Sequence, residues 1–433
     1  MAINTVCVVG LGYIGLPTAA MLASKDVKVI GVDVDPATVD AVNCGVVPFV
    51  EPDLATYVAG AVRHGTLRAT RYPEPADAYV VAVPTPLGDR REPDLSAVEK
   101  AVRALAPVLR GGELVVLEST APPGCTQRVA DWIVEERPDL VAGPHRDEHG
   151  GAPLLRVHVA HCPERVLPGR VMIELVTNDR VVGGLTPEAS RQARELYAVF
   201  CQGEILLTDA RTAELTKLVE NSYRDVNIAF ANELSLVADR IGVDVWELIR
   251  LANHHPRVDI LRPGPGVGGH CIAVDPWFLV DAAPDETPLI RAAREVNDAK
   301  PEHVAQQVLK AVEDVERPRI AALGLTFKAN VDDLRGSPAV EVVRRLAQAR
   351  PDARIAVSDP FVRSLPEELA LPNVRLVSTA SALRASDSQV VLVGHAAFGP
   401  ALSGLVDVSG LVDVCGILWS DPRLPGGDGE PSC

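Results

Sequence analysis

One cysteine near the middle of the chain stands at the end of a glycine-rich segment. Residues 263–271 read Pro-Gly-Pro-Gly-Val-Gly-Gly-His-Cys, and Asp275 follows four residues after Cys271. Glycine has no side chain to block a substrate, and it accepts backbone angles that other residues avoid. The Cys271 thiol is therefore a candidate nucleophile for a carbonyl carbon. The alternative is that Cys271 is a small buried hydrophobic residue, which is the usual role of a cysteine.

A glycine triplet near the N-terminus predicts a dinucleotide site. Gly10, Gly12 and Gly15 lie between a short apolar run and a helical stretch, and a second apolar run ends at Asp33. In this arrangement the glycines let a pyrophosphate approach the N-terminus of the helix. The carboxylate of Asp33 is placed to accept hydrogen bonds from the adenosine ribose, which favours NAD over NADP.

A nucleophilic thiol together with a hydride acceptor indicates one chemistry above others. An aldehyde bound to the thiol as a thiohemiacetal loses a hydride to the nicotinamide and becomes a thioester. The remaining sequence must supply the strands, helices and loops that hold these two groups.

The first part of the chain is typical of parallel strands that end in polar loops. Apolar runs at 78–83 and 114–117 lead into Pro84-Thr85 and into Glu118-Ser119-Thr120. Doubly wound sheets bind their ligands at this edge, so Thr120 is either a ligand contact or the cap of the next helix. Residues 138–153 are rich in Pro, Gly and His, which predicts a surface loop.

A long helix is predicted over residues 211–242, where no glycine or proline interrupts the apolar periodicity until Gly242. Lys217 and Asn221 are four residues apart and share one face of it. Such a pair can bind a substrate hydroxyl or a water, or it can be part of a solvated face. A helix of this length also suits a subunit interface.

The last third repeats the alternation of strands and helices, with strands expected at 319–325, 354–358, 389–393 and 411–414. A helix is expected to begin at Ser337-Pro338. Lys328 and Arg335 precede it, and two cations beside a helix N-terminus suit a diphosphate. The predicted fold class is α/β, with two Rossmann-like doubly wound domains joined by a long central helical region.

Composition narrows the range of partners. The 433 residues carry a net charge of -16, which argues against nucleic acid. Eight cysteines show no zinc-type spacing, so no metal site is predicted, and they are typical of reduced thiols in a cytoplasmic protein. We expect neither a signal peptide nor a membrane span, because no long apolar run occurs.

Ten segments together resemble the UDP-glucose/GDP-mannose dehydrogenase family over nearly the whole chain. They are GLGYIGLPTA at 10–19, VPTP at 83–86, EST at 118–120, PERVLPG at 163–169, NDRVVGG at 178–184, KLVENSYRDVNIAFANELS at 217–235, WELIRLANHHPRV at 246–258, PGPGVGGHCIAVDPWF at 263–278, REVND at 294–298 and LTFKANVDDLRGSPA at 325–339. The resemblance implies oxidation of a sugar C6 alcohol to a carboxylate with two NAD+ per turnover. It implies an NAD-binding domain at 1–205, a dimerisation region at 206–300 and a nucleotide-sugar domain at 301–433.

The resemblance also assigns roles to single residues. The catalytic group comprises Cys271 as nucleophile, with Lys217, Asn221, Asp275, Glu164 and Thr120 around the C6 oxygen and the water. The cofactor contacts are Gly10, Gly12, Tyr13, Ile14, Gly15, Asp33, Pro84, Thr85, Thr120 and Arg335. The substrate contacts are Glu164, Arg165, Val166, Lys217, Asn221, Arg257, Arg262, Gly268 and Lys328. The chain departs from the pattern at Thr38, where many relatives carry an arginine, and at Cys415, where close relatives carry a lysine.

The expected substrate is a nucleotide sugar, and the segment 257–278 favours UDP-N-acetylmannosamine. UDP-N-acetylglucosamine, UDP-glucose and GDP-mannose follow as alternatives, and a homodimer or higher homo-oligomer is expected. Two other classes stay open on the residues alone: a two-electron hydroxyacid dehydrogenase, and a sensor of nucleotide sugars that does no chemistry.

Overall fold

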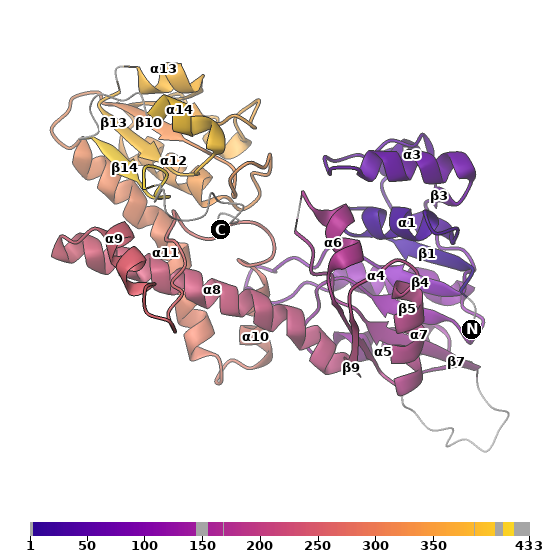
Figure 1. Ribbon diagram of the computed structural model, residues 1–433. Coiled ribbons are helices and arrows are strands. Elements are labelled where there is room, and N and C mark those ends of the chain that lie inside the picture. The colour runs from indigo at the N-terminus through magenta and orange to yellow at the C-terminus, as the bar shows by residue number, and fades with distance from the viewer. Residues whose placement is uncertain (1–2, 144–154, 168, 385, 403–409, 420–433) are drawn as a thin grey trace. The chain divides into compact units, whose positions relative to one another are not determined.

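The computed structural model describes residues 3–143, 155–167, 169–384, 386–402 and 410–419. The chain divides into two compact units (Figure 1). The first unit comprises residues 1–220 and 277–282, and the second comprises residues 221–276 and 283–433. The chain passes from one unit to the other within helices α8 (Ala210–Ile241) and α10 (Asp275–Ala282).

The first unit is built on a sheet with the strand order β3-β2-β1-β4-β5-β7-β8-β9, and β6 pairs with β7 beside this path. Its central strands are short apolar runs that are buried on both faces, as expected for parallel strands covered by helices. The named strands pair in parallel except for β7 with β8. The strands are β1 (Thr5–Val9), β2 (Lys28–Val32), β3 (Leu67–Thr70), β4 (Ala78–Val81), β5 (Leu114–Leu117), β6 (Leu140–Ala142), β7 (Leu155–His161), β8 (Arg180–Gly184) and β9 (Ile205–Asp209).

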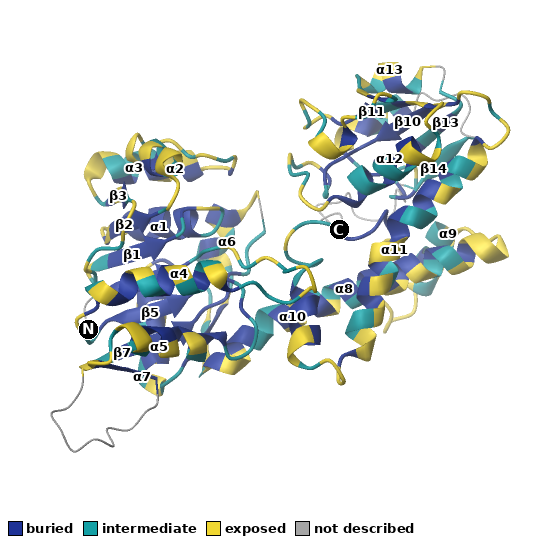
Figure 2. Cartoon of the chain, turned by 180° about the vertical axis from the view of Figure 1, so that it is seen from behind, coloured by how far each residue is buried: buried dark blue, intermediate teal, exposed yellow. Residues whose placement is uncertain are grey.

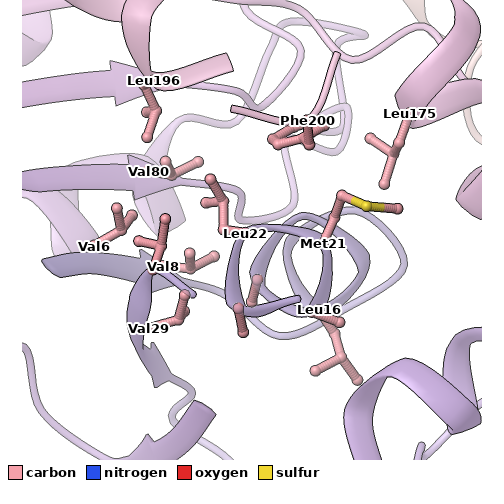
Figure 3. Close-up of a cluster of buried hydrophobic side chains, with 14 of the residues drawn as sticks. Val6, Val8, Leu16, Met21, Leu22, Val29, Val80, Leu175, Leu196 and Phe200 are labelled. Atoms are coloured by element: carbon pink, nitrogen blue, oxygen red, sulfur yellow. The ribbon is translucent and has the colours of Figure 1, made fainter. Parts of the chain in front are cut away.

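Helices cover both faces of this sheet, because successive residues of a strand point to opposite sides. Val6 and Val8 of β1 pack with α1, α6 and α7 on one face (Figure 3), whereas Cys7 and Val9 pack with α4 and α5 on the other. Figure 2 shows the resulting contrast between buried strands and the exposed outer sides of the helices. The helices are α1 (Gly15–Ala23), α2 (Pro36–Asn43), α3 (Leu54–His64), α4 (Ser96–Leu105), η1 (Ala106–Val108), α5 (Cys125–Glu136), α6 (Val171–Thr177) and α7 (Pro187–Tyr197).

The second unit combines long helices with a parallel sheet of order β12-β11-β10-β13-β14. Ile320 and Ala322 of β10 pack under α11 and α12, and Ala321 and Leu323 face the shorter helices on the other side. The strands are β10 (Arg319–Leu323), β11 (Arg354–Ser358), β12 (Val374–Leu376), β13 (Ser388–Val391) and β14 (Leu411–Asp413). The remaining helices are α9 (Val245–Ala252), α11 (Pro288–Ala311), α12 (Pro338–Ala349), η2 (Glu367–Leu369), α13 (Thr379–Leu383), η3 (Ala396–Phe398) and α14 (Gly399–Leu402).

The predicted fold class is confirmed, since both sheets have the strand order of a Rossmann-type half, 3-2-1-4-5 in their own numbering. The helix predicted over 211–242 is α8, and Ser337 caps α12 by accepting from the amide of Ala339 at 3.2 Å. The loop predicted over 138–153 was wrong at Leu140–Ala142, which form β6, and residues 144–153 lie outside the described residues. None of the helices in the described residues is long and apolar enough to cross a bilayer.

Candidate active site

The glycine triplet forms a tight turn between β1 and α1. Gly10 has a φ of +95°, and a Cβ there would lie 2.4 Å from the carbonyl oxygen of Ala82. A Cβ on Gly15 would lie 1.9 Å from the carbonyl oxygen of Gly10, so both positions exclude any side chain. A Cβ on Gly12 would meet no described atom within 4 Å, and no described side chain caps the first turn of α1. Open space beside uncapped amides fits the pyrophosphate of NAD.

Asp33, at the end of β2, is held in place by the backbone. Its two oxygens each accept one amide, from Leu11 at 2.9 Å and from Asp35 at 2.9 Å, which leaves lone pairs for ribose hydroxyls. Thr38 lies one turn further on and donates its hydroxyl to Asp35 at 2.9 Å. Thr38 therefore takes part in the cap of α2.

The loops after β4 and β5 are joined by a serine. The hydroxyl of Ser119 accepts the amide of Val83 at 2.9 Å and donates to the carbonyl of Val83 at 2.7 Å. This contact fixes the loop that carries Pro84 and Thr85 beside the loop that carries Thr120. Both loops follow the carboxyl ends of neighbouring parallel strands, where this fold binds its ligands.

Lys217 of α8 lies against the second of these loops, and its ammonium donates to the hydroxyl of Thr120 at 2.7 Å. One turn earlier, the buried carboxylate of Glu214 accepts the amides of Gly124 and Thr126, both at 2.6 Å, and the hydroxyl of Thr126. Glu214 thus caps α5 from a neighbouring helix, although burial raises its pKa. This cap sets the register of α8 and hence the position of Lys217.

Glu164 belongs to a buried charged cluster in the first unit. Arg180 of β8 donates to Glu164 at 3.1 Å and lies 3.8 Å from the second carboxylate, Glu118. Glu118 also accepts from the hydroxyls of Thr18 and Tyr197, each at 3.1 Å. Burial raises the pKa of Glu118, and the negative charge of Glu164 raises it further.

The neighbours of Glu164 in the sequence are tied to the same loop. Arg165 donates its own amide to Glu164 at 2.7 Å and its guanidinium to Glu220 at 2.9 Å, and Val166 packs partly buried against the core. Burial raises the pKa of the Cys162 thiol to about 12, so this sulfur is a protonated packing group.

In the second unit, the glycines before Cys271 admit neighbouring protein atoms. A Cβ on Gly268 would lie 2.7 Å from the carbonyl oxygen of Gly336, and one on Gly269 would lie 3.0 Å from the ring of Phe327. The glycines therefore let the loop at 263–271 pack against residues 325–338. The Cys271 side chain is half-buried.

Asn221 and Asp275 flank this loop and contact each other. The side-chain amide of Asn221 donates to the buried carboxylate of Asp275 at 2.5 Å. The carbonyl of Cys271 accepts the amide of Asp275 at 2.8 Å, so the cysteine opens the turn that leads into α10. The structure thus groups Cys271, Asn221 and Asp275 within the second unit, and Lys217, Thr120 and Glu164 within the first.

A buried polar network that contacts the glycine-rich loop at 263–271 was not predicted from the sequence. Asn232 of α8 accepts the amide of Gly264 at 2.9 Å and donates to Asn297 of α11 at 2.8 Å. Asn297 in turn donates to Asp225 at 2.8 Å, and Arg294 donates to the same carboxylate at 2.6 Å. The sequence contains an indication of this network, because Asp225 and Asn232 are polar residues seven positions apart on the buried face of α8.

The remaining predicted cations have different surroundings. Arg335 donates to Asp333 at 2.6 Å; burial alone would raise the pKa of Asp333, but this contact lowers it. The carbonyl of Lys328 accepts the hydroxyl of Thr326 at 2.8 Å, which fixes the backbone of that loop. Arg257 and Arg262 are exposed in the segment after α9.

A glycine turn that fits NAD, a second Rossmann-type sheet and a cysteine turn beside an Asn–Asp pair define a dinucleotide-dependent dehydrogenase. The chain belongs to the UDP-glucose/GDP-mannose dehydrogenase family. The family's NAD binding domain matches residues 4–201, its central domain residues 211–299 and its UDP binding domain residues 321–418. The protein is thus an oxidoreductase that uses NAD to oxidise a nucleotide sugar twice.

Several relatives are similar over most of their length. An NDP-N-acetyl-D-galactosaminuronic acid dehydrogenase of Ralstonia nicotianae is 56% identical over 91% of this chain and 92% of its own. A UDP-N-acetyl-D-mannosamine dehydrogenase of Escherichia coli (strain K12) is 52% identical over 92% and 95%. The structure of a UDP-D-ManNAc dehydrogenase from Pyrococcus horikoshii is similar with a TM-score of 0.81, 35% identity and 97% of each chain covered.

Proposed function

We propose that the protein oxidises the C6 hydroxyl of UDP-N-acetyl-D-mannosamine to the carboxylate, with Cys271 as the covalent nucleophile. The observation that carries the proposal is the cysteine turn, in which Cys271 lies between a glycine loop packed on protein and a buried Asp275 bound to Asn221. The sugar follows from the relatives of E. coli and P. horikoshii, which are named for that substrate.

In the first oxidation the C6 hydroxyl must lose a proton as its hydride leaves. When bound, NAD+ accepts that hydride. A water held by Asp275, or the amine of Lys217 in its neutral form beside Thr120 at 2.7 Å, takes the proton. The predicted cofactor contacts Gly10, Gly12, Gly15 and Asp33 hold the dinucleotide, with Tyr13, Ile14, Pro84, Thr85 and Arg335 around it.

In the second oxidation the Cys271 thiolate adds to the aldehyde carbon and forms a C–S bond. The oxyanion of this thiohemiacetal needs hydrogen-bond donors, and Lys217 and Asn221 supply an ammonium and an amide. Loss of the second hydride, which a second NAD+ would accept, leaves a thioester. A water activated by Glu164 or Asp275 attacks it, which breaks the C–S bond and returns the thiol with the carboxylate product.

The residues proposed for the rest of the substrate are Arg165, Val166, Gly268, Lys328, Arg257 and Arg262. Their cations suit the diphosphate and the polar groups of the sugar. The relative from R. nicotianae favours a second candidate, the nucleotide-linked N-acetylgalactosamine. The two candidates share the same chemistry at C6 and differ only in the configuration of the sugar ring.

Counting NADH per sugar tests this function. The purified protein is mixed with NAD+ and, separately, with UDP-N-acetylmannosamine, UDP-N-acetylgalactosamine, UDP-N-acetylglucosamine, UDP-glucose and GDP-mannose. We expect two NADH for each molecule of UDP-N-acetylmannosamine and the highest kcat/KM for it. The highest kcat/KM with the galacto sugar would replace the proposed substrate, and one NADH per sugar would reject the thioester step.

A Cys271→Ser variant tests the nucleophile directly. Serine keeps the size of the side chain but is a weak nucleophile at neutral pH, so we expect acid production to fall by about 10³-fold or more. Cys44→Ser is the matched control, because Cys44 is an exposed cysteine of the first unit. Full acid production by Cys271→Ser, measured by mass spectrometry of the product, would defeat the assignment.

We further propose that the protein acts as a homodimer in the cytoplasm. Tyr223, Phe230 and Val237 of α8 are seven residues apart and exposed to 72%, 52% and 48%. Residues at this spacing lie on one face of a helix, and an apolar stripe of this kind is suited to the same stripe of a second copy. The cytoplasm suits a protein whose cysteines show no disulfide-type spacing.

A further inference from the structure

A histidine that has no role in the proposed chemistry lies beyond the carboxyl end of the second sheet. His395 follows β13, Asp359 follows β11, and Thr326 follows β10, which is the strand between them. The side chains of His395 and Asp359 are fully buried. The histidine ring also packs against Phe361 and Phe398, with centroid distances of 5.1 and 5.3 Å.

The hydrogen bonds of His395 define which nitrogen carries its proton. The amide of Asn330 donates to Nδ1 at 3.0 Å, so Nδ1 is an acceptor. Nε2 therefore carries the proton, and it faces Asp359 Oδ2 at 3.0 Å and Thr326 Oγ1 at 3.2 Å. The same carboxylate oxygen accepts the amides of Leu325 and Thr326 at 2.7 and 3.2 Å.

These bonds hold residues 325–330 of the loop that follows β10. Residues 325 and 326 are bound at the start of this segment, Asn330 is bound at its end, and the side chain of Asn330 accepts the amide of Ala396 at 3.1 Å. Between them, the hydroxyl of Thr326 donates to the carbonyl of Lys328 at 2.8 Å. While both ring nitrogens of His395 keep these hydrogen bonds, the loop is restrained at Thr326 and at Asn330.

The middle of this loop supports the cysteine turn. The ring of Phe327 lies so close to Gly269 that a Cβ on the glycine would be 3.0 Å from it. The amide of Gly269 donates to the carbonyl of Arg335 at 3.2 Å, and Phe327 donates its own amide to Asp333 at 3.0 Å. Gly269 is two residues from Cys271, so the loop at 325–335 contacts the cysteine turn close to the thiol.

We propose that His395, with Asp359, is a positioning residue for the reaction. It anchors the loop at 325–335. Through Phe327 and Gly269 this loop determines the position of the Cys271 thiol, and the same anchoring determines the position of Lys328, which lies on the loop. The inference rests on the proposed role of Cys271. The contacts that carry it all lie within the second unit, and they form a continuous path from the histidine to the cysteine turn.

Two substitutions separate positioning from simple loss of stability. His395→Leu removes the polar contacts of both ring nitrogens, whereas His395→Asn keeps an acceptor near Nδ1 for the amide of Asn330. Asp387→Asn is the control, because Asp387 binds Arg319 at the amino end of the same sheet, with 2.8 Å to its amide. Thr326→Val is a second test of the same path, and it keeps the shape of the side chain.

The primary measurement is amide hydrogen exchange of peptides that cover 264–276 and 325–335. We expect His395→Leu and Thr326→Val to raise exchange in both segments by about tenfold, and His395→Asn to restore most of the protection. Asp387→Asn should change neither segment. If His395→Leu does not fold, Thr326→Val and His395→Asn alone decide the question. Unchanged exchange over 264–276 while the loop at 325–335 loosens would overturn the proposal.

Steady-state kinetics give the second measurement. Displacement of the thiol should lower kcat by about tenfold or more with a smaller change in KM for the nucleotide sugar. An equal loss for Asp387→Asn, or a full kcat for His395→Leu, would also overturn the proposal. Hydrogen exchange does not depend on turnover, so a wrong substrate or nucleophile would leave this test intact.

Discussion

At the scale of single residues, the first unit buries two carboxyl groups, those of Glu118 and Glu164, close to each other. Burial raises the pKa of Glu118, the charge of Glu164 raises it further, and Arg180 lowers it. Arg180 is itself buried, with its guanidinium over the rings of Tyr197 and Phe200 at 4.6 and 5.3 Å. The guanidinium of Arg180 therefore offsets part of the cost of burying the carboxyl groups of Glu118 and Glu164 side by side.

Replacing this arginine should give a pH-dependent loss of stability. Arg180→Met leaves both carboxyl groups buried without a cation, which should cost about 3–5 kcal/mol at neutral pH. A carboxyl whose pKa is higher in the folded than in the unfolded state destabilises the fold as the pH rises above the unfolded value, and this cost is relieved as the pH falls. We therefore expect the difference in melting temperature from the unmodified protein to be smaller at about pH 5.5 than at about pH 7.5.

The control for this prediction is Arg103→Met. Arg103 binds three glutamates at the surface, with contacts of 2.7 to 2.8 Å, and its loss should change the melting temperature far less because solvent screens exposed ion pairs. A difference for Arg180→Met that stays constant or widens toward acid pH would contradict the account of Glu118.

The sequence predicts roles for residues whose chemistry is visible in their type and neighbours. Cys271 after glycines, Asp33 after a strand, and Lys217 and Asn221 on one helix face are such residues, and their roles stay predictions. Glu214, Arg180 and His395 were not given a role, because each acts only through a partner that is distant in the sequence. Glu214 meets Thr126 across 88 positions, and His395 meets Thr326 across 69.

At the scale of elements, the contact between the N-terminus of α5 and helix α8 depends on the side chain of Glu214. No side chain of α5 itself caps its N-terminus among the described residues, and Gly124 stands at that position with a φ of +91°. Glu214 supplies the missing acceptor from α8. The negative charge of Glu214 also lies at the positive end of the dipole of α5, which adds to the stability of the contact between α5 and α8.

Removal of this side chain should weaken both the fold and the reaction. Glu214→Ala leaves two partly buried amides without an acceptor, which should cost about 2–4 kcal/mol and lower the melting temperature by several degrees. The kcat should fall as well, because Lys217 lies one turn away. Glu220→Ala is the control on the same helix, since Glu220 makes an exposed ion pair with Arg165. Equal melting temperatures for the two variants would exclude the capping role.

Elements were predicted best where burial is uniform. The run at 114–117 coincides with β5, because a strand covered on both faces is continuously apolar. Strand β6 was missed, because three residues carry too little periodicity to distinguish a strand from a loop. The glycines before Cys271 were identified as important, but the reason lies in Phe327 and Gly336, which only the folded chain brings close.

At the scale of the whole molecule, charge and apolar surface act in opposite directions on self-association. Each chain carries a net charge of -16, so two copies repel each other at low salt. Long-range repulsion of this kind is screened at physiological ionic strength, whereas burial of apolar side chains is not weakened by salt. The stripe of Tyr223, Phe230 and Val237 supplies apolar side chains for such burial along about four turns of α8.

A charge placed in the middle of the stripe should therefore separate the proposed dimer. We expect the unmodified protein to have twice the mass of the 46.1 kDa chain in light scattering at physiological salt. Phe230→Glu should shift the mass to that of one chain, because an unpaired carboxylate at the centre of an apolar contact would lose its hydration. Leu289→Glu is the control, since Leu289 is 66% exposed and lies on α11 rather than on the stripe. A single-chain mass for the unmodified protein, or dissociation by Leu289→Glu alone, would show that the face of α8 is not the contact between copies.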